Sequence, residues 1–366
     1  MPIFMDRHIV PGIEAKHAAE AHREDLKIQD LYGCRCMTYW VDEARGSAFC
    51  LIDAPNEEAV IKLHEKAHGL LPYEIIQVNS NVVEAFLGRI HDPESYSLSS
   101  GENLKVFNDP AFRVILKTQT SNHRLLVHTY GLEKAQKLVN LYNQTIQEQL
   151  KKHEGRQVEL PDPGCVISFI SVSQAIQYAI SVQKSLHLAA ELLDLRIGIH
   201  AGIPVDNNNM IFGDTMKFAN YLCGIGKGGQ IIMSSLIHEL SKEDHNRMEG
   251  SSFIVNIDSF QENILEHLMN TLLDNWQDQK FGVSDYCNAM GMSQSQLYRK
   301  CLDITGISPN ELLREFRLNK SLEYLNTARN ISETSFECGF NSPSYFTKCF
   351  QNRFGLQPLA FLKIGV

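Results

Sequence analysis

The sequence has 366 residues, of which 43% are hydrophobic and 21% are charged, and its formal net charge at pH 7 is −9. This composition is typical of folded globular domains and excludes an intrinsically disordered chain. The acidic balance excludes a protein that coats nucleic acid by bulk electrostatic attraction, because such binding needs a dense basic surface. Any contact with DNA must therefore be confined to a local part of the chain.

The length predicts two or three domains at roughly 100 to 200 residues each, and we expect three. We place them at residues 1–78, 111–258 and 259–366, with a linker over residues 79–110. The start of the chain, MPIFMDRHIVPG, has no basic and apolar leader, and no apolar run reaches the about 18 residues needed to span a membrane. We therefore expect a cytoplasmic protein without membrane contact. The nine cysteines, odd in number and scattered, indicate reduced thiols.

The first segment predicts the element order β-α-β-β-α-β. The strand PIFMDRHI is followed by a helix over residues 14–32, and the apolar runs CRCMTYWVD and SAFCLIDA are separated by a turn at Gly46. A second helix opens at Asn56 and stops at Gly69, and EIIQV closes the unit. This order is that of the ferredoxin-like α/β plait.

The same segment concentrates side chains that coordinate metal ions. They are His8, His17, His22, Cys34, Cys36, Tyr39, Cys50, His64 and His68. His64 and His68 are four residues apart on a predicted helix, so both imidazoles lie on one face. Imidazole with occasional thiolate or carboxylate suits nickel, zinc or copper better than calcium or magnesium. The pattern therefore predicts a transition-metal site.

The stretches MPIFMDRH, AEAHREDLKIQDLYG, TYWVDE, FCLIDAP and HEKAHGL resemble a family of small ferredoxin-like proteins with a nickel-binding member. The resemblance covers residues 1–78 and implies a bound transition metal, nickel or zinc. We take His8, His22, His64 and His68 as the candidate ligands. The alternative is that these histidines serve only in the core and at a dimer surface.

The second segment alternates strands with helices, which indicates an α/β layer architecture. We expect strands at FRVILK, RLLVHTYG, GCVISFIS, LRIGIHAG and QIIMSS. We expect helices over residues 133–154 and 214–223 and at SQAIQYAISVQKSLHL. The linker before this segment is expected to hold one short helix.

Residues 112–240 resemble the class III nucleotidyl cyclase domain, through GRQVELPDPGCVISF and LRIGIHAGIPVDNNNMIFGDTMKFANYLCGIGKGGQIIMSS. In that family two Asp residues hold the metal ions of phosphoryl transfer. The resemblance places Gln119 at the first of these positions and Pro163 at the second, where Asp162 is the neighbouring alternative. It places Glu159 where a base-recognising Lys is common and Tyr221 where a transition-state Arg is expected. An amide and a proline cannot hold two magnesium ions, so we expect no enzyme but a dimerisation platform, or else a nucleotide-sensing pocket.

The last segment is helical, and it contains two helix-turn-helix units. In the first, a helix ends at Gly291 and a second begins after Ser293, which is a good N-cap. We expect Leu297, Cys301 and Leu302 to point inward, and the outward residues are candidates to reach base edges in the major groove. These outward residues are Gln294, Ser295, Tyr298 and Arg299.

The second unit is ISETSFECGFNSPSYFTKCFQNRFG, with Phe346 and Phe350 pointing inward. Its outward candidates are Asn341, Ser344, Tyr345 and Lys348. Arg299 is the best expected reader of a base, because a guanidinium bonds guanine at two points, and Lys348 is expected to contact a base or a phosphate.

The last hundred residues resemble the DNA-binding domain of the AraC/XylS regulator family, through GISPNELLREFRL, ECGFNSPSYFTKCF and FGLQP. The resemblance implies a double-stranded DNA operator, a homodimer and contact with RNA polymerase. Thr334 and Ser335 depart from it, because those positions are usually small and apolar. The leading hypothesis is a transcription regulator controlled by a metal ion or small ligand. The alternatives are an enzyme, either a cyclase or an oxygen-handling plait, fused to a DNA-binding domain, and a ligand-independent dimeric DNA-binding protein.

Overall fold

The computed structural model of the chain describes residues 1–94, 97–98, 104–159, 164–186, 188–206, 209–242, 252–327 and 330–364. The chain divides into two compact units. The first comprises Met1–Lys117, His153–Ala175 and His200–Ala219, and the second comprises Thr118–Lys152, Ile176–Ile199 and Asn220–Val366. In the described part of the chain, no helix combines the length and the apolar composition needed to cross a membrane.

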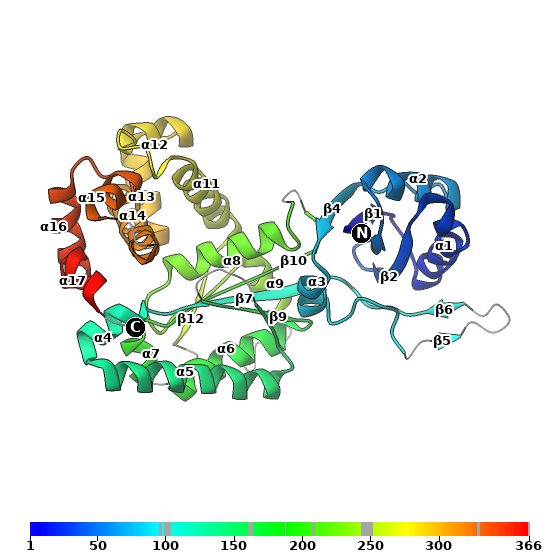
Figure 1. The fold of residues 1–366 in the computed structure, drawn as a ribbon, viewed down its shortest axis with the longest axis horizontal. Helices are drawn as coiled ribbons and strands as arrows, with labels where there is room; N and C mark the ends of the chain where they lie inside the picture. Colours follow the sequence, from blue (N-terminus) through cyan, green and yellow to red (C-terminus); the bar gives the residue numbers. More distant parts are fainter. Residues whose placement is uncertain are drawn as a thin grey trace. The chain divides into compact units, whose positions relative to one another are not determined.

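The N-terminal part of the first unit is a four-stranded antiparallel sheet with two helices (Figure 1, blue). Its elements are β1 (Ile3–Ile9), α1 (Ala15–Ile28), a 3₁₀ turn (Gln29–Tyr32), β2 (Arg35–Asp42), β3 (Ser47–Asp53), α2 (Glu57–Ala67) and β4 (Glu74–Val78). The strand order is β2-β3-β1-β4. The predicted ferredoxin-like plait is confirmed, with Asn56 capping α2 and Gly46 at a φ of 59° in the hairpin.

Alternation along the central strand β1 explains why polar groups enter the core of the plait. Successive strand residues point to opposite faces of a sheet, so Phe4, Asp6 and His8 share one face. Phe4 packs with Val60 and Leu63 of α2, whereas Met5 belongs to the core on the other face. Asp6 and His8 therefore point toward the helices, where both are buried.

A six-stranded sheet with strand order β12-β11-β10-β7-β9-β8 follows. Its strands are β7 (Arg113–Gln119), β8 (Arg156–Val158), β9 (Cys165–Phe169), β10 (Arg196–Gly202), β11 (Ile231–Met233) and β12 (Ile254–Asn256). The helices of the same segment are α4 (His123–Tyr130), α5 (Leu132–His153), α6 (Val172–Leu186), α7 (Leu188–Leu192), α8 (Gly213–Ile225) and α9 (Ser235–Leu240). The short elements α3 (Ser80–Leu87), β5 (Ser97–Leu98) and β6 (Lys105–Val106) lie in the expected linker.

One expectation for this segment is wrong, because RLLVHTYG forms the helix α4 rather than a strand. The Asn122 side chain accepts a hydrogen bond from the backbone N–H of Arg124, which favours the start of a helix. Leu126 is the one buried residue of this helix, so the segment shows neither a clear helical nor a clear strand periodicity of apolar residues. The short helix expected in the linker is α3, which buries Val83 and Phe86.

The C-terminal part of the second unit is all-α, as predicted. Its helices are α11 (Ser259–Asn275), α12 (Val283–Met290), α13 (Gln294–Thr305), α14 (Pro309–Asn326), α15 (Ile331–Glu337), α16 (Pro343–Phe354) and α17 (Pro358–Lys363). The pairs α12–α13 and α15–α16 are the two helix-turn-helix units (Figure 1, yellow to red). The long helix α14 joins them, and Leu318, Leu322 and Leu325 pack with Phe346 and Phe350 in one core.

Candidate functional site

The helix face of the plait holds a buried cluster of ionisable side chains from four elements. Asp6 and His8 come from β1, Cys50 from β3 and His64 from α2, and one ligand atom of each lies within 4.8 Å of the others. A second group, which shares His64, adds Asp25 from α1 and His68 from the end of α2, again within 4.8 Å.

His64 is at the centre of this cluster and is 0% exposed. Its Nε2 lies 2.7 Å from Asp6 Oδ2, and its Nδ1 lies 3.1 Å from Asp25 Oδ1. The Nε2 atom of His68 lies 3.3 Å from the same Asp25 oxygen. The Asp6 carboxylate also accepts a hydrogen bond of 3.0 Å from the Cys50 backbone N–H.

The cluster balances charge in a largely buried site. Burial opposes the charged imidazole, but the carboxylates of Asp6 and Asp25 raise the pKa of His64 to about 10. Burial alone would raise the pKa of Asp6, but His8 and His64 lower it overall. Burial and the nearby Asp6 raise the pKa of the Cys50 thiol. At neutral pH the cluster therefore holds an imidazolium between two carboxylates, beside a protonated thiol.

His8 is the member of the cluster whose bonding is incomplete. The residue is 4% exposed, and neither ring nitrogen makes a hydrogen bond to any described residue. Its Nε2 lies 3.4 Å from Asp6 Oδ1, and its ring centroid lies 4.8 Å from that of His64. A buried polar group without a hydrogen bond is costly and needs an explanation. Together with two carboxylates and a second imidazole, this nitrogen fits a transition-metal ion with nitrogen and oxygen ligands.

The other two predicted ligands are placed differently. The His68 Nδ1 accepts a hydrogen bond of 3.1 Å from the Leu70 backbone N–H, which assigns the proton of a neutral ring to Nε2. Binding a metal through Nε2 would therefore require this contact to break. His22 belongs to neither group among the described residues; its Nε2 lies 3.9 Å from Asp92 Oδ1, and burial lowers its pKa.

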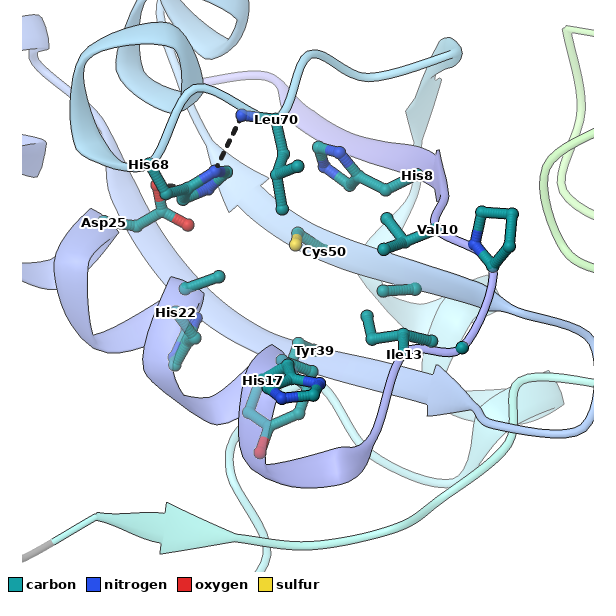
Figure 2. A pocket seen from close by; sticks show the side chains of 15 residues that line it. His8, Val10, Ile13, His17, His22, Asp25, Tyr39, Cys50, His68 and Leu70 are labelled. Carbon is teal, nitrogen blue, oxygen red and sulfur yellow. Dashed lines mark hydrogen bonds and ion pairs between the residues drawn. The ribbon is translucent and has the colours of Figure 1, made fainter.

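Sequence reasoning missed Asp6 and Asp25 as members of the cluster. The signal for Asp6 was available, because it lies two residues before His8 on a strand and so shares its face. Asp25 lies three residues after His22, on the same side of α1, and is 1% exposed. Figure 2 shows the Asp25 carboxylate beside His68, with His22 and His17 further along α1.

The first helix-turn-helix unit exposes all four of its predicted contact residues. Ser293 caps α13 by accepting a hydrogen bond from the Gln296 backbone N–H, and Gly291 ends α12 at a φ of 59°. Leu297 and Cys301 are buried as predicted, but Leu302 is 44% exposed, which corrects that expectation. The buried pair has the i, i+4 spacing of one helix face, and Leu302 lies one position off it. The exposed residues are Gln294, Ser295, Tyr298 and Arg299.

The second helix-turn-helix unit has the same arrangement, with α16 as its second helix. The Ser342 side chain accepts from the Tyr345 backbone N–H, and Pro343 occupies the first turn, where a missing N–H costs nothing. Phe346 and Phe350 are 0% exposed, as predicted. The predicted contact residues are all exposed, namely Asn341, Ser344, Tyr345 and Lys348. Each unit therefore presents a helix whose outer face is polar and carries a cation.

The second helix-turn-helix unit is in close contact with the backbone at the end of α11. The Arg317 guanidinium on α14 donates to the carbonyl oxygens of Trp276 and Asp278, each over 2.7 Å. Gly339, between α15 and α16, lies at a φ of 73°, and a Cβ atom there would overlap the Trp276 carbonyl oxygen and the Arg317 side chain. Only glycine fits this approach, which fixes α15 against the end of α11.

The positions assigned to cyclase chemistry belong to the central segment of the chain. Gln119 is the last residue of β7, and Glu159 is exposed just after β8. Pro163 lies outside the described residues, as does Asp162. Tyr221 is 2% exposed on α8, and its hydroxyl lies 2.7 Å from Asn270 Oδ1 on α11.

Comparison with known proteins supports the family resemblances predicted for the N-terminal and C-terminal segments. Residues 286–364 match the model of a helix-turn-helix domain, and residues 4–78 match a model described as nickel responsive protein SCO4226-like. The C-terminal part is thus similar to AraC-type helix-turn-helix regulators and the N-terminal part to nickel-responsive proteins, which agrees with the two resemblances found in the sequence.

Individual relatives resemble only parts of the chain. It is 35% identical over 105 residues to the "Histidine kinase P4" of Formosa agariphila, which covers 28% of this chain and 8% of that protein. It is 32% identical over 109 residues to the "Uncharacterized HTH-type transcriptional regulator YdeC" of Bacillus subtilis, over 28% of this chain and 37% of that protein. The solved adenylate/guanylate cyclase/hydrolase of Silicibacter pomeroyi is similar at 21% identity and a TM-score of 0.32, over 36% of this chain and 81% of that one. The chain therefore spans only 8% and 37% of the length of the two curated relatives.

Proposed function

We propose that this chain is a sequence-specific transcription regulator that binds double-stranded DNA through its two helix-turn-helix units and responds to a metal ion held by the plait. The observation that carries the DNA-binding part is the pair of capped helices, α13 and α16, each with a buried apolar face and an exposed polar face. Residues at the start of such helices reach base edges in the major groove. Arg299 and Lys348 are the cations on these faces.

The metal centre consists of Asp6, His8 and His64, with Cys50 and Asp25 at its edge. The observation that carries this part is the buried His8 imidazole, which makes no hydrogen bond to any described residue although it lies beside a carboxylate. His64 would give up its proton on binding, because a metal ligand must be deprotonated, and the ion would supply the positive charge that the imidazolium supplies in the metal-free protein. Nickel or zinc is the expected ion, because both accept imidazole and carboxylate ligands.

The test measures metal content and DNA affinity on the full chain. After purification with nickel or zinc, elemental mass spectrometry gives the metal bound per chain for the wild type, for His8→Gln, and for His91→Ala, an exposed histidine outside the cluster. A DNA sequence selected from a random double-stranded pool then gives the affinity with and without the metal. We expect stoichiometric metal in the wild type and in His91→Ala, and little in His8→Gln.

Metal-dependent regulation also requires a change in DNA affinity. A coupling of about 1 to 3 kcal/mol between two sites corresponds to a change of about 5- to 150-fold, and reciprocity demands that DNA change the metal affinity equally. Bound metal with an unchanged DNA affinity would leave a DNA-binding protein with a structural metal. Failure to select any DNA sequence would refute the regulator itself.

We further propose that the central segment is not a cyclase, that the chain acts as a homodimer, and that it contacts RNA polymerase when bound to DNA. Gln119 and Pro163 lack the carboxylates that two catalytic metal ions need. Tyr221 instead supports α11, the helix that precedes the first helix-turn-helix unit. Incubation with magnesium or manganese and ATP or GTP should yield no cyclic nucleotide, and any turnover would restore the enzyme alternative.

A further inference from the structure

The plait contains a cavity of about 270 Å³ between α1 and β3, next to the ionisable cluster (Figure 2). The sequence creates it by placing alanines on facing elements: Ala18 and Ala21 on α1 and Ala48 on β3. Larger side chains at these positions would close the space. Val10, Ile13 and Leu70 complete an apolar wall.

The polar lining of the cavity comes from His8, Asp25 and His68 on one side and from His17, His22 and Tyr39 on the other (Figure 2). His8 is the informative group, because it is 4% exposed, lines the cavity, and makes no hydrogen bond through either nitrogen to a described residue. The Asp25 carboxylate is already engaged by His64 and His68. A largely apolar cavity with a few polar groups, one of them unsatisfied, is the usual form of a small-molecule site.

We propose that this cavity binds a neutral organic molecule of about one ring, with one hydrogen-bonding group directed at His8. Its size supports this class, since an apolar cavity of about 150 Å³ already accommodates benzene. The Asp25 carboxylate in the lining disfavours an anionic ligand, and the apolar wall gives a charged ligand no replacement for its hydration. A hydroxyl or N–H group satisfies a ring nitrogen of His8 without adding charge.

The test uses phenol and toluene, which share one ring and differ by the hydroxyl group. Binding to the metal-free full chain is measured by ligand-observed NMR titration. We expect both to bind at one site, with phenol about five-fold tighter than toluene, the effect of one net hydrogen bond. His8→Leu replaces the imidazole with an apolar side chain, so the affinities for phenol and for toluene should become equal.

A filling variant locates the ligand. Ala21→Leu should weaken phenol binding by about ten-fold or more, because the added side chain occupies the cavity, and leucine preserves the helix. Glu20→Leu is the matched control, since it places the same side chain one residue earlier on α1, outside the cavity lining, and should change phenol affinity by less than about two-fold.

Two results would overturn the inference: no binding of either probe, or equal weakening by Ala21→Leu and Glu20→Leu. Because these titrations contain neither metal nor DNA, their failure leaves the proposed metal-responsive regulator untouched. Conversely, phenol binding that persists in a chain that takes up no nickel or zinc would refute the metal centre and leave the organic site standing.

Discussion

His64 Nε2 lies 2.7 Å from Asp6 Oδ2, and neither side chain of this pair, 58 positions apart in sequence, is accessible to solvent. Removing one partner of a buried ion pair leaves the other charged and unpaired, at a cost of about 3 to 5 kcal/mol. We therefore expect His64→Ala to lower the free energy of unfolding of the metal-free protein by this amount in urea denaturation. Unchanged stability would mean that Asp6 is neutral in the fold.

His8→Gln gives the contrasting result in the same cluster. His8 contributes a 3.4 Å contact to Asp6 Oδ1 but no hydrogen bond to a described residue, so the free energy of unfolding of the metal-free protein should fall by less than in His64→Ala, by about 1 to 2 kcal/mol. Metal binding should nevertheless fall by about ten-fold or more, because an imidazole ligand is lost. Calorimetric titration with nickel and urea denaturation of the same sample separate the two effects. A variant that loses stability as much as His64→Ala would assign His8 a structural role.

Arg299→Ala tests the reading of base edges by α13. A two-point contact between an arginine and guanine contributes about 1 to 3 kcal/mol of discrimination, so affinity for the selected site should fall and specificity at one position should relax. Lys363→Ala removes one positive charge from the exposed surface of α17 and is the matched control. Competition binding against single-base variants of the site measures both effects. Equal losses for Arg299→Ala and Lys363→Ala would indicate general electrostatic attraction only.

The sequence patterns predicted the plait and both helix-turn-helix units because these depend on local signals. The caps at Asn56, Ser293 and Ser342 and the alternation of β1 are properties of a few neighbouring residues. The buried cluster was only half predicted, because its histidines stand out by residue type, whereas Asp6 and Asp25 do not, although strand alternation places Asp6 on the face of His8. Their role depends on contacts between β1, α1 and α2, which no local pattern encodes.

His200 on β10 makes stability depend on pH. Burial lowers its pKa from 6.5 to about 4, so between these values the unfolded chain binds a proton that the folded chain does not. The contribution of His200 to the free energy of unfolding is therefore fully present above pH 6.5 and is lost as the pH falls toward 4. We expect urea denaturation to show about 1 to 2 kcal/mol less stability at pH 5 than at pH 7 from this residue. His200→Leu should remove that part of the difference, and an identical pH dependence in the variant would contradict the assignment.

Gly339→Ala and Gly306→Ala form a matched pair in the C-terminal domain. Both glycines have positive φ, 73° and 74°, so alanine at either position costs about 1 kcal/mol of backbone strain. At Gly306 no described atom beyond its chain neighbours lies within 4 Å of the added Cβ, whereas at Gly339 it overlaps the Trp276 carbonyl oxygen. Thermal unfolding should therefore show Gly339→Ala to be less stable than Gly306→Ala by about 1 to 3 kcal/mol. Equal stabilities would show that α15 is not held against α11.

Thr334 and Ser335 on α15 should limit the stability of the second helix-turn-helix unit. Both residues are 0% exposed, and neither hydroxyl has a hydrogen-bond partner among the described residues. A buried hydroxyl without a partner costs about 1 to 3 kcal/mol, and replacing it with an apolar group of the same shape removes that cost. Thr334→Val and Ser335→Ala should therefore each raise the free energy of unfolding by about 0.5 to 2 kcal/mol in urea denaturation. Thr327→Val, at an exposed position where the hydroxyl donates to the Tyr324 carbonyl oxygen, is the control and should not stabilise. Destabilisation by both core substitutions would mean that the hydroxyls have partners, such as bound water. There would then be no reason to expect the second helix-turn-helix unit to be less stable than the first.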